Sequence, residues 1–396
     1  MKRVLLTGAT GLVGQYLVRD LLRAGIKLVV VIRGQAGVSG RQRLAKILSN
    51  WDRDGGEPLG RPVCLEGDLT RDGLGLDDEA IRWISQNCGT VLHNAASLSF
   101  VGADRAKEPW LSNFTGTRNV LDLCQRTGIA DYHHVSTAYV CGKRSGRVFE
   151  EDLDCGQQFR NDYEQSKFEA EKLVRSADFL EAPTIYRPAI IVGDSRTGFT
   201  STYHGLYSYL QFVCLLREYM HPRPDGVFHV PVRINLTGNE PRNLVPVDWV
   251  SEVIARILQD PELHGRTYHL APQRCATARE IQDTVAAYFK YTGPYFAGPE
   301  ALNKGDLNAQ EKMFYTYVAR YQPYWAEEPR FDCTNTVAAV PDLPCPPIDA
   351  ACISRLLDYA IRDKWGRASN GSANGKHNGT HTAEEVLKEI AAGAPV

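Results

Sequence analysis

The sequence predicts an α/β protein: a Rossmann-type doubly wound parallel sheet with a smaller C-terminal substrate-binding lobe. Short β-branched apolar runs alternate with amphipathic stretches, and a glycine-rich turn separates the first run from the first such stretch. Fully apolar runs such as residues 28–32 are typical of parallel strands buried on both faces. The expected strands are residues 3–6, 28–32, 62–65, 90–93, 132–135, 182–192 and 267–270. The expected helices are residues 13–24, 41–51, 77–86, 113–127, 247–259, 277–289 and 348–364.

The same pattern divides the chain into a sheet domain and a lobe. Residues 1–198 form the predicted nucleotide-binding Rossmann domain, with returning elements at 243–275. The alternation loosens from about residue 199, so residues 199–242 and 276–366 are assigned to the lobe. Residues 367–396 are expected to be a disordered tail, because they include a low-complexity run of Gly, Ser, Asn and His that is too polar to bury.

Composition excludes several classes of protein. The chain has 396 residues, a formal net charge of -2, 43% hydrophobic and 23% charged residues, which argues against a nucleic-acid partner or a polybasic membrane anchor. The longest apolar stretch, residues 206–216, is too short to span a bilayer. Its 10 cysteines have neither a CxxC pair nor zinc-site spacing, so we expect reduced thiols in a cytoplasmic protein and no metal site.

The glycine-rich turn is the first candidate binding element. Gly8 permits a tight turn, Gly11 lets the backbone approach a pyrophosphate, and Gly14 lets the following helix pack on the sheet. The start of that helix offers free N–H groups and a favourable dipole to phosphates. The alternative is a turn with a purely structural role. The predicted cofactor-binding residues here are Thr7, Gly8, Thr10, Gly11, Leu12, Val13 and Gly14.

The residue that follows the second strand indicates which nucleotide is bound. Enzymes that use NAD tend to place an acid there for the ribose 2′-hydroxyl, whereas this chain has Arg33. A guanidinium suits a 2′-phosphate, and Arg43 in the next element offers a second charge. The sequence therefore favours NADP (NADPH) over NAD, unless both arginines are solvated surface residues.

The third and fourth strands are also followed by candidate cofactor contacts. Asp68 and Leu69 come after the third strand, where a carboxylate can accept from the adenine amino group and an N–H can support the ring. Asp68 is alternatively an ordinary helix cap. After the fourth strand, Asn94, Ala95 and Ala96 are small enough to leave room beside the cofactor.

A Tyr-x-x-x-Lys pattern marks the candidate catalytic centre. Tyr163 and Lys167 share one face of a helix, so both side chains reach the same place. Reduction of a carbonyl needs a proton donor for the developing alkoxide, and a nearby ammonium lowers the pKa of a tyrosine. Thr137 follows an earlier strand, where a hydroxyl would hold the carbonyl oxygen. Ser136 is the neighbouring candidate, and only one of the two should point inward.

Over roughly residues 1–290 the chain resembles the extended short-chain dehydrogenase/reductases. The matching pieces are TGATGLVG, GDL, HNAA, NFTGTRN, HVSTAYVCG, YEQSK, the pair Arg187-Pro188 and NLVPVDWV. The resemblance implies that Thr137, Tyr163 and Lys167 carry out the chemistry and that Asn113 supports the active-site backbone. It also implies that Arg187, Pro188 and Ile190 belong to the cofactor site.

Within that superfamily the chain is similar to the fatty acyl-CoA reductase and thioester reductase branch. The segments IRGQAGVSGRQRLAKIL, YRPAIIVGDSRTG and YQPYWAEEPRFDCTNT carry this resemblance. It implies hydride transfer from NADPH to an acyl thioester, either acyl-CoA or carrier-bound. The product would be an aldehyde and, after a second hydride, an alcohol. Many relatives form homodimers, so a homodimer is also expected by analogy.

Two other functions remain open at this stage. One is a dehydrogenase, reductase or epimerase that acts on a secondary alcohol, a ketone or a sugar nucleotide; the other is a non-catalytic NADP-sensing protein. The lobe does not decide between them, because its aromatic residues suit either an apolar acyl pocket or plain core packing. These aromatic residues are Phe199, Tyr203, Tyr207, Tyr209, Phe212 and Tyr219.

Overall fold

The computed structural model describes residues 2–52, 59–102, 104–219, 222–300, 304–319, 321–325 and 328–367. The chain forms two compact units. The first comprises Met1–Ile191, Val247–Gln273 and Pro329–Cys345, and the second comprises Val192–Pro246, Arg274–Glu328 and Pro346–Val396. Residues 329–345, which the sequence analysis assigned to the lobe, thus group with the first unit. From residue 368 onward the predicted tail lies outside the described residues.

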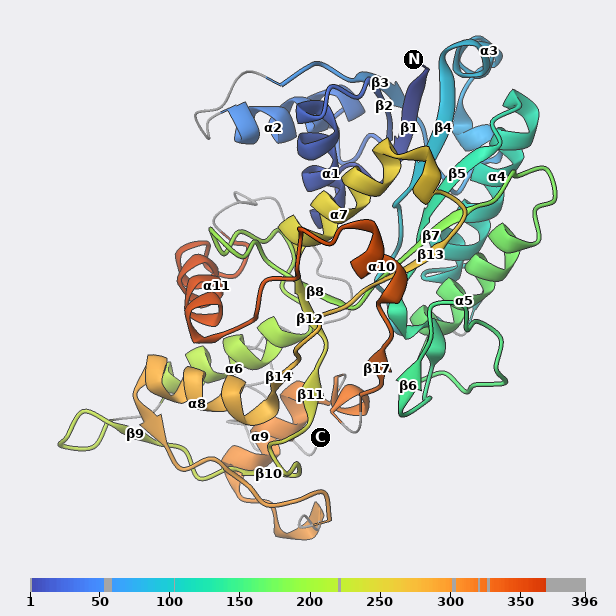
Figure 1. Cartoon of the computed structure of the whole chain (residues 1–396). Helices are drawn as coiled ribbons and strands as arrows, with labels where there is room; N and C mark the ends of the chain where they lie inside the picture. Colours follow the sequence, from blue (N-terminus) through green and yellow to red (C-terminus); the bar gives the residue numbers. More distant parts are fainter. Residues whose placement is uncertain are drawn as a thin grey trace. The chain divides into compact units, whose positions relative to one another are not determined.

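Seven strands in the described part of the first unit form one parallel sheet, in the order β3-β2-β1-β4-β5-β7-β13. The order changes direction between β1 and β4, which is the topology of a doubly wound fold. This sheet confirms the predicted fold class (Figure 1). The strands are β1 (Arg3–Thr7), β2 (Leu28–Ile32), β3 (Val63–Glu66), β4 (Cys88–His93), β5 (Asp131–Val135), β7 (Thr184–Pro188) and β13 (Thr267–Leu270).

Helices cover both faces of this sheet. In Figure 1, α1, α2 and α7 lie on one side and α3, α4 and α5 on the other. Their bounds are α1 (Leu12–Arg23), α2 (Gly40–Asp52), α3 (Asp78–Asn87), α4 (Gly116–Thr127), α5 (Asp162–Arg175) and α7 (Val247–Gln259). The unit also contains β6 (Arg147–Val148), which pairs with β17 (Arg330–Phe331), and α10 (Thr334–Ala339). No helix in the described ranges combines the length and the apolar character needed to span a membrane.

The apolar sequence pattern accounts for this packing. All five residues of β2 are buried, as expected for a central strand covered on both faces. Helix α4 ends at Gly128, whose positive φ of 68° suits a residue without a side chain. The face covered by α3, α4 and α5 holds a continuous apolar core that includes Leu5, Val91 and Val120. These elements fix the carboxyl ends of the strands, where the candidate site lies.

Two predicted elements differ from the structure. The helix expected at residues 113–127 is α4 preceded by one π-helical turn, η2 (Leu111–Thr115). The strand expected at 182–192 is divided at Ala189 into β7 and β8 (Ile190–Val192). Pro188 precedes this break and has no N–H to donate to a neighbouring strand, although Ala189 still donates to the Leu270 carbonyl oxygen of β13 at 2.9 Å.

The described part of the second unit contains the α-helices α6 (Leu206–Tyr219), α8 (Ala278–Phe289), α9 (Ala309–Val318) and α11 (Ala350–Arg362). Its strands are short: β9 (Phe228–His229), β10 (Arg233–Ile234), β11 (Pro241–Arg242), β12 (Leu244–Pro246), β14 (Ala276–Thr277), β15 (Tyr291–Thr292) and β16 (Tyr295–Phe296). The sequence analysis did not predict α6 or α9 as helices.

Aromatic residues of the lobe serve the packing of the second unit. Tyr207 and Phe212 are buried, and the Phe212 ring packs on Phe314. The Tyr203 hydroxyl donates to Asp363, and the Tyr209 hydroxyl contacts Gln282. These contacts favour core packing over a pocket lining for the four predicted residues. The side chain of Tyr219 lies outside the described part of the structure.

Candidate functional site

The three glycines of the first turn meet different constraints. A Cβ at Gly8 would lie 2.6 Å from the backbone of Ala95, and Gly8 has a φ of 73°. A Cβ at Gly14 would lie 2.0 Å from the carbonyl oxygen of Gly8. At Gly11, however, the nearest atom would be 3.6 Å away, which is an ordinary contact. Internal packing therefore requires glycine at positions 8 and 14, whereas glycine at position 11 keeps the start of the helix uncovered.

The open start of α1 suits an anion. Gly11 is the N-cap residue and provides no side-chain cap, so the N–H groups of the first turn, at Leu12 and Val13, are not capped by it. Thr10 lies beside this turn, and its hydroxyl accepts a hydrogen bond from Arg43 at 3.2 Å. A helix start of this kind binds phosphate groups through backbone N–H donors and the helix dipole. The residues present therefore fit a nucleotide pyrophosphate.

A buried hydrogen-bond chain joins the ends of β1 and β4. The Thr7 hydroxyl lies 2.7 Å from Nδ1 of His93, and Nε2 of His93 lies 3.0 Å from the Thr117 hydroxyl. Burial, with a smaller contribution from the charge of Lys167, lowers the pKa of His93 to about 3, so this ring is neutral. Asn94 donates to the carbonyl oxygen of Gly8 at 3.2 Å. The side chains of Thr7 and Asn94 therefore hold the turn itself, and the sequence analysis missed the role of His93.

Arg33 and Arg43 lie together after β2. Nη1 of Arg43 donates to the Arg33 carbonyl at 2.6 Å, which brings the second arginine to the end of the strand. Burial and the positive charge of Arg33 lower the pKa of Arg43. The Arg33 side chain is 59% exposed, and its ion pair with Asp68 is long, at 3.5 Å. Two cations are thus held close together with little compensating negative charge.

Asp68 is occupied mainly by its own turn. One carboxylate oxygen accepts from the N–H of Thr70 at 3.0 Å and from its hydroxyl at 2.8 Å. Burial raises the pKa of Asp68, but these hydrogen bonds and Arg33 together hold it below its ordinary value. The next residue, Leu69, accepts a hydrogen bond from Asn119 through its carbonyl oxygen. Asp68 is not a helix cap, because Arg71 is the N-cap residue of the short helix that follows; the carboxylate instead holds a local turn at Thr70.

Two adjacent hydroxyls after β5 point to different partners. The Thr137 side chain contacts Tyr163 closely enough to lower the pKa of the tyrosine, and its hydroxyl lies 3.4 Å from the Pro188 carbonyl oxygen. Ser136 instead donates to Glu171 at 2.7 Å. The structure therefore brings Thr137, and not Ser136, to the tyrosine. Because side chains alternate along extended backbone, only one of the two can face this site.

Burial dominates the titration of the tyrosine and the lysine. Burial raises the pKa of Tyr163 to about 12, against the effect of its hydrogen bond with Thr137. Burial lowers the pKa of Lys167 to about 8, against the negative charge of Glu171. Lys167 is 1% exposed and donates to the Val135 carbonyl oxygen at 2.8 Å. Lys167 is not among the groups that shift the pKa of Tyr163 in this structure, so its effect on the tyrosine stays a prediction.

Asn113 connects the π-helical turn to the helix that carries Tyr163. Its side chain donates to the Ser97 carbonyl at 3.1 Å and to the Ser166 hydroxyl at 2.9 Å, and it accepts from the Ser97 N–H at 2.7 Å. Asn113 is fully buried and Ser166 lies on α5, three residues after the tyrosine. These contacts fix the loop after β4, which includes the half-buried Ala95 and the exposed Ala96. Asn113 thus positions backbone, as the resemblance implied.

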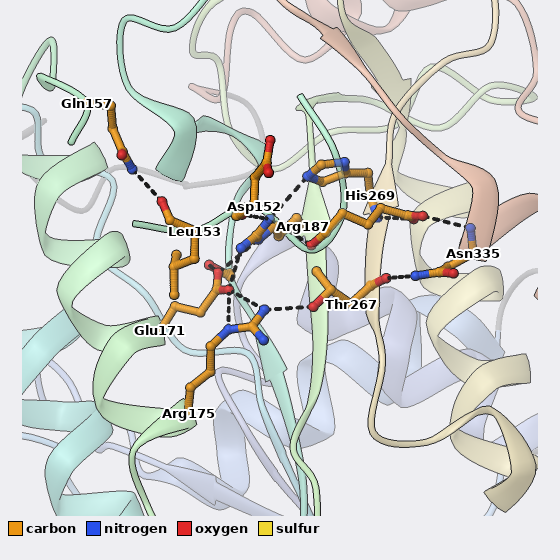
Figure 2. Close-up of polar contacts among 11 residues, drawn as sticks. Asp152, Leu153, Gln157, Glu171, Arg175, Arg187, Thr267, His269 and Asn335 are labelled. Carbon is orange, nitrogen blue, oxygen red and sulfur yellow. Dashed lines mark hydrogen bonds and ion pairs between the residues drawn. The ribbon is translucent and has the colours of Figure 1, made fainter. Parts of the chain in front are cut away.

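Arg187 has a different role from the one predicted. Its guanidinium is 1% exposed and donates to both oxygens of Glu171, at 3.0 and 2.7 Å, and to the carbonyl oxygen of Asp152 at 2.7 Å. Figure 2 shows this side chain enclosed by Glu171, Asp152 and His269. A guanidinium engaged in this way cannot reach a nucleotide. The sequence prediction is corrected on this point, because the buried acid Glu171 takes the charge.

A signal for Glu171 was present in the sequence. It stands four residues after Lys167, which itself follows Tyr163 by four, so all three occupy one face of α5. Pro188 and Ile190, the other predicted residues of this segment, lie at the end of β7 and the start of β8. Pro188 is buried and Ile190 is half-buried.

A family model described as Male sterility protein matches residues 6–254, which is more than half of the chain and includes the glycine turn. The chain belongs to this family. The match confirms the resemblance to the extended short-chain dehydrogenase/reductases and to their thioester reductase branch. The chain is accordingly an oxidoreductase with an NAD(P)-binding domain.

Individual relatives agree with this placement. The nonribosomal peptide synthetase asaC of Aspergillus flavus is 27% identical over 286 residues, which cover 68% of this chain and 26% of that protein. The aldehyde reductase lnbA of the same organism is 28% identical over 284 residues, which cover 68% of this chain and 26% of that protein. The chain thus spans about a quarter of these curated relatives. The terminal R domain from the myxalamid PKS-NRPS biosynthetic pathway is 25% identical, with a TM-score of 0.73, and 93% of this chain and 92% of that one are covered.

Proposed function

We propose that this protein uses NADPH to reduce an acyl thioester, carrier-bound or attached to coenzyme A, to an aldehyde. The observation that carries the proposal is the contact between the side chains of Thr137 and Tyr163, with the buried cation Lys167 one helical turn further along α5. The likeness to a peptide synthetase terminal R domain supports the thioester as the substrate class.

The arginine pair supports the choice of NADPH. Arg33 stands where NAD enzymes place an acid, and Arg43 is held beside it by a hydrogen bond to the Arg33 backbone. A 2′-phosphate between the two guanidiniums would relieve their mutual repulsion and accept charge-assisted hydrogen bonds from both. The pyrophosphate would lie at the start of α1, where Gly11 leaves the backbone uncovered.

The residues of the site match the needs of thioester reduction. NADPH supplies one hydride, which adds to the acyl carbon while the carbonyl electron pair moves onto oxygen. The hydroxyls of Thr137 and Tyr163 donate to this oxygen and stabilise its charge. The oxygen pair then re-forms the C=O bond, the C–S bond breaks, and sulfur leaves with its electron pair and takes a proton. One hydride and one proton thus convert the thioester into an aldehyde and a thiol, and a second pair would give an alcohol.

A coupled assay tests the proposed reaction. NADPH consumption is followed with acyl-CoA thioesters and with acyl groups on a phosphopantetheinylated carrier protein, while released thiol is measured in parallel. The expected result is one thiol released for each NADPH consumed in the first reduction. Turnover of ketones or of sugar nucleotides, without any turnover of thioesters, would contradict the proposal.

The tyrosine provides the first mutational test. Tyr163→Phe removes the hydroxyl that would hold the carbonyl oxygen, so turnover should fall by about 10²–10⁴-fold while NADPH affinity stays nearly unchanged. The matched control is Tyr132→Phe, because the Tyr132 hydroxyl is buried without a hydrogen-bond partner among the described residues. A parallel loss of NADPH affinity in Tyr163→Phe would show instead that this tyrosine has a structural role.

A further inference from the structure

Three potential metal ligands converge at the amino end of β5, away from the candidate catalytic centre. Asp131 and His133 alternate along the strand and project to the same face, and His264 follows the short helix η4 (Pro261–Leu263). Oδ1 of Asp131 lies 3.3 Å from Nε2 of His133 and 3.4 Å from Nδ1 of His264. All three ligand atoms lie within 4.8 Å of one another. All three residues belong to the first unit.

These separations match the edges of a metal coordination sphere. Four ligand atoms placed tetrahedrally at about 2.0–2.1 Å from a zinc ion are about 3.3 Å apart. The carboxylate oxygen already lies at this distance from both imidazole nitrogens. The third edge, between the two imidazole nitrogens, is at most 4.8 Å long and would have to shorten on metal binding.

Each of the three side chains also has a hydrogen bond through an atom that does not face the common centre. Nδ1 of His133 lies 2.9 Å from the Tyr186 hydroxyl, Nε2 of His264 lies 3.3 Å from the Leu258 carbonyl oxygen, and the second oxygen of Asp131 accepts from the Thr90 hydroxyl at 2.6 Å. Outer contacts of this kind fix the tautomer and orientation of metal ligands in proteins. Here they leave one nitrogen of each ring and one carboxylate oxygen directed at the common centre.

The hydrogen-bond pattern leaves a need for positive charge at that centre. A carbonyl oxygen only accepts, so Nε2 of His264 carries the hydrogen in its contact with Leu258. Nδ1 of His264, which lies 3.4 Å from a carboxylate oxygen of Asp131, therefore carries either a proton, which the raised pKa of His264 beside Asp131 favours, or a metal ion that replaces this proton. The His133 ring is 0% exposed, and its Nε2 lacks a well-formed hydrogen bond in the part of the chain that the structure describes. A cation at the centre would satisfy all three atoms together.

We propose that Asp131, His133 and His264 bind a divalent transition-metal ion of the zinc class. Two imidazoles with one carboxylate suit zinc and its neighbours, whereas calcium and magnesium prefer oxygen ligands alone. Water would complete the tetrahedron from the solvent side, where the side chains of Asp131 and His264 are 31% and 18% exposed. The sequence analysis predicted no metal site, because the ligands come from segments that are far apart in the chain.

The position of the site indicates a structural role. Asp131 is the first residue of β5, and six residues of nearly extended chain, roughly 20 Å, separate it from Thr137. The ion would join β5 to the connection between α7 and β13 and, through Tyr186, to β7. It would therefore stabilise the sheet without taking part in hydride transfer. The inference does not depend on the proposed substrate.

Metal binding to the full chain tests the proposal. The protein is treated with chelator, dialysed and titrated with Co²⁺, whose visible absorption intensifies at four-coordinate sites, and with Zn²⁺ in competition. One strongly bound ion per chain is expected, and Asp131→Asn and His264→Gln should each weaken binding at least about tenfold. His229→Gln, an exposed histidine of the second unit, is the matched control. A His377→Gln/His381→Gln background removes the histidines of the C-terminal tail.

Thermal unfolding gives an independent readout. Zn²⁺ should raise the melting temperature of the wild type and of His229→Gln, but not that of His264→Gln. Should a ligand variant fail to fold, Tyr186→Phe removes only the contact to His133 and should weaken Co²⁺ binding by about 10–100-fold. Equal Co²⁺ affinity in the wild type and Asp131→Asn, or no binding by the wild type, would overturn the proposal and leave an Asp131–His264 ion pair.

Discussion

Arg187 and the pair Arg33 and Arg43 were all predicted to contact the nucleotide, yet the structure gives them opposite surroundings. Arg187 is 1% exposed, and Glu171 neutralises it through two hydrogen bonds. Arg33 is 59% exposed, has one long contact to Asp68, and lies beside a second cation. A buried guanidinium with an acid of its own stabilises the fold. Two guanidiniums held together, one exposed and one half-buried, with a single long contact to an acid, are suited to an anionic ligand.

The largest effect is expected at the buried pair. Arg187→Leu leaves Glu171 buried without its main partner, so the free energy of unfolding should fall by about 3–5 kcal/mol. Arg175→Leu is the matched control, since Arg175 pairs with the same carboxylate but is 33% exposed, and it should cost about 1 kcal/mol. Urea unfolding measures both. Equal losses in the two variants would mean that Arg187 is not the residue that neutralises Glu171.

Acid titration sharpens the same prediction. Burial raises the pKa of Glu171, but Arg187, Arg175 and Ser136 together lower it to about 2, below its ordinary value of 4.5. A depressed carboxylate pKa contributes stability that is complete above about pH 4.5 and is lost as the pH falls toward 2. In Arg187→Leu the pKa rises, so unfolding on acidification should begin at a higher pH than in the wild type.

An intermediate effect is expected at the exposed arginine. Arg33→Ala removes one of two cations available to a 2′-phosphate, so the Kd for NADPH should rise by about 10–100-fold while the Kd for NADH changes little. Arg41→Ala changes the net charge equally from an exposed position on the same helix as Arg43 and should leave both affinities unchanged. Titration calorimetry with each nucleotide measures the difference. Equal weakening of NADPH and NADH would contradict the assignment.

The sheet could be predicted because its signal is local. Each strand is a short apolar run that carries its own pattern, and the expected strand at 267–270 and helix at 247–259 coincide with β13 and α7. Helix α6 was missed because its own apolar and aromatic residues are spread around the whole helix, so the sequence lacks a clear polar face. The π-helical turn at Asn113 was missed because no residue type marks an extra residue in a helical turn.

The site was predictable only as far as short motifs reach. Tyr163 and Lys167 follow from helical spacing within one element. The role of Arg187 depends on Glu171, which belongs to another element, so the motif identified the arginine but not its partner. The same limit applies to Asp68, because the motif does not show that the turn at Thr70 takes one oxygen of this carboxylate.

The smallest effect separates two neighbouring hydroxyls. Ser136→Ala removes one hydrogen bond to Glu171, which keeps its arginine partners, so unfolding should become easier by about 1 kcal/mol while turnover per folded enzyme stays nearly constant. Thr137→Val should show the reverse, with little loss of stability and a turnover lowered by about 10²-fold or more, because Thr137 contacts Tyr163. Urea unfolding and NADPH-dependent turnover, measured on both variants, make the comparison. A loss of turnover in Ser136→Ala as large as in Thr137→Val would mean that the hydrogen bonds of the buried Glu171 also set the position of Tyr163. The residues of α5 that stabilise the fold could then not be separated from those that face the ligand.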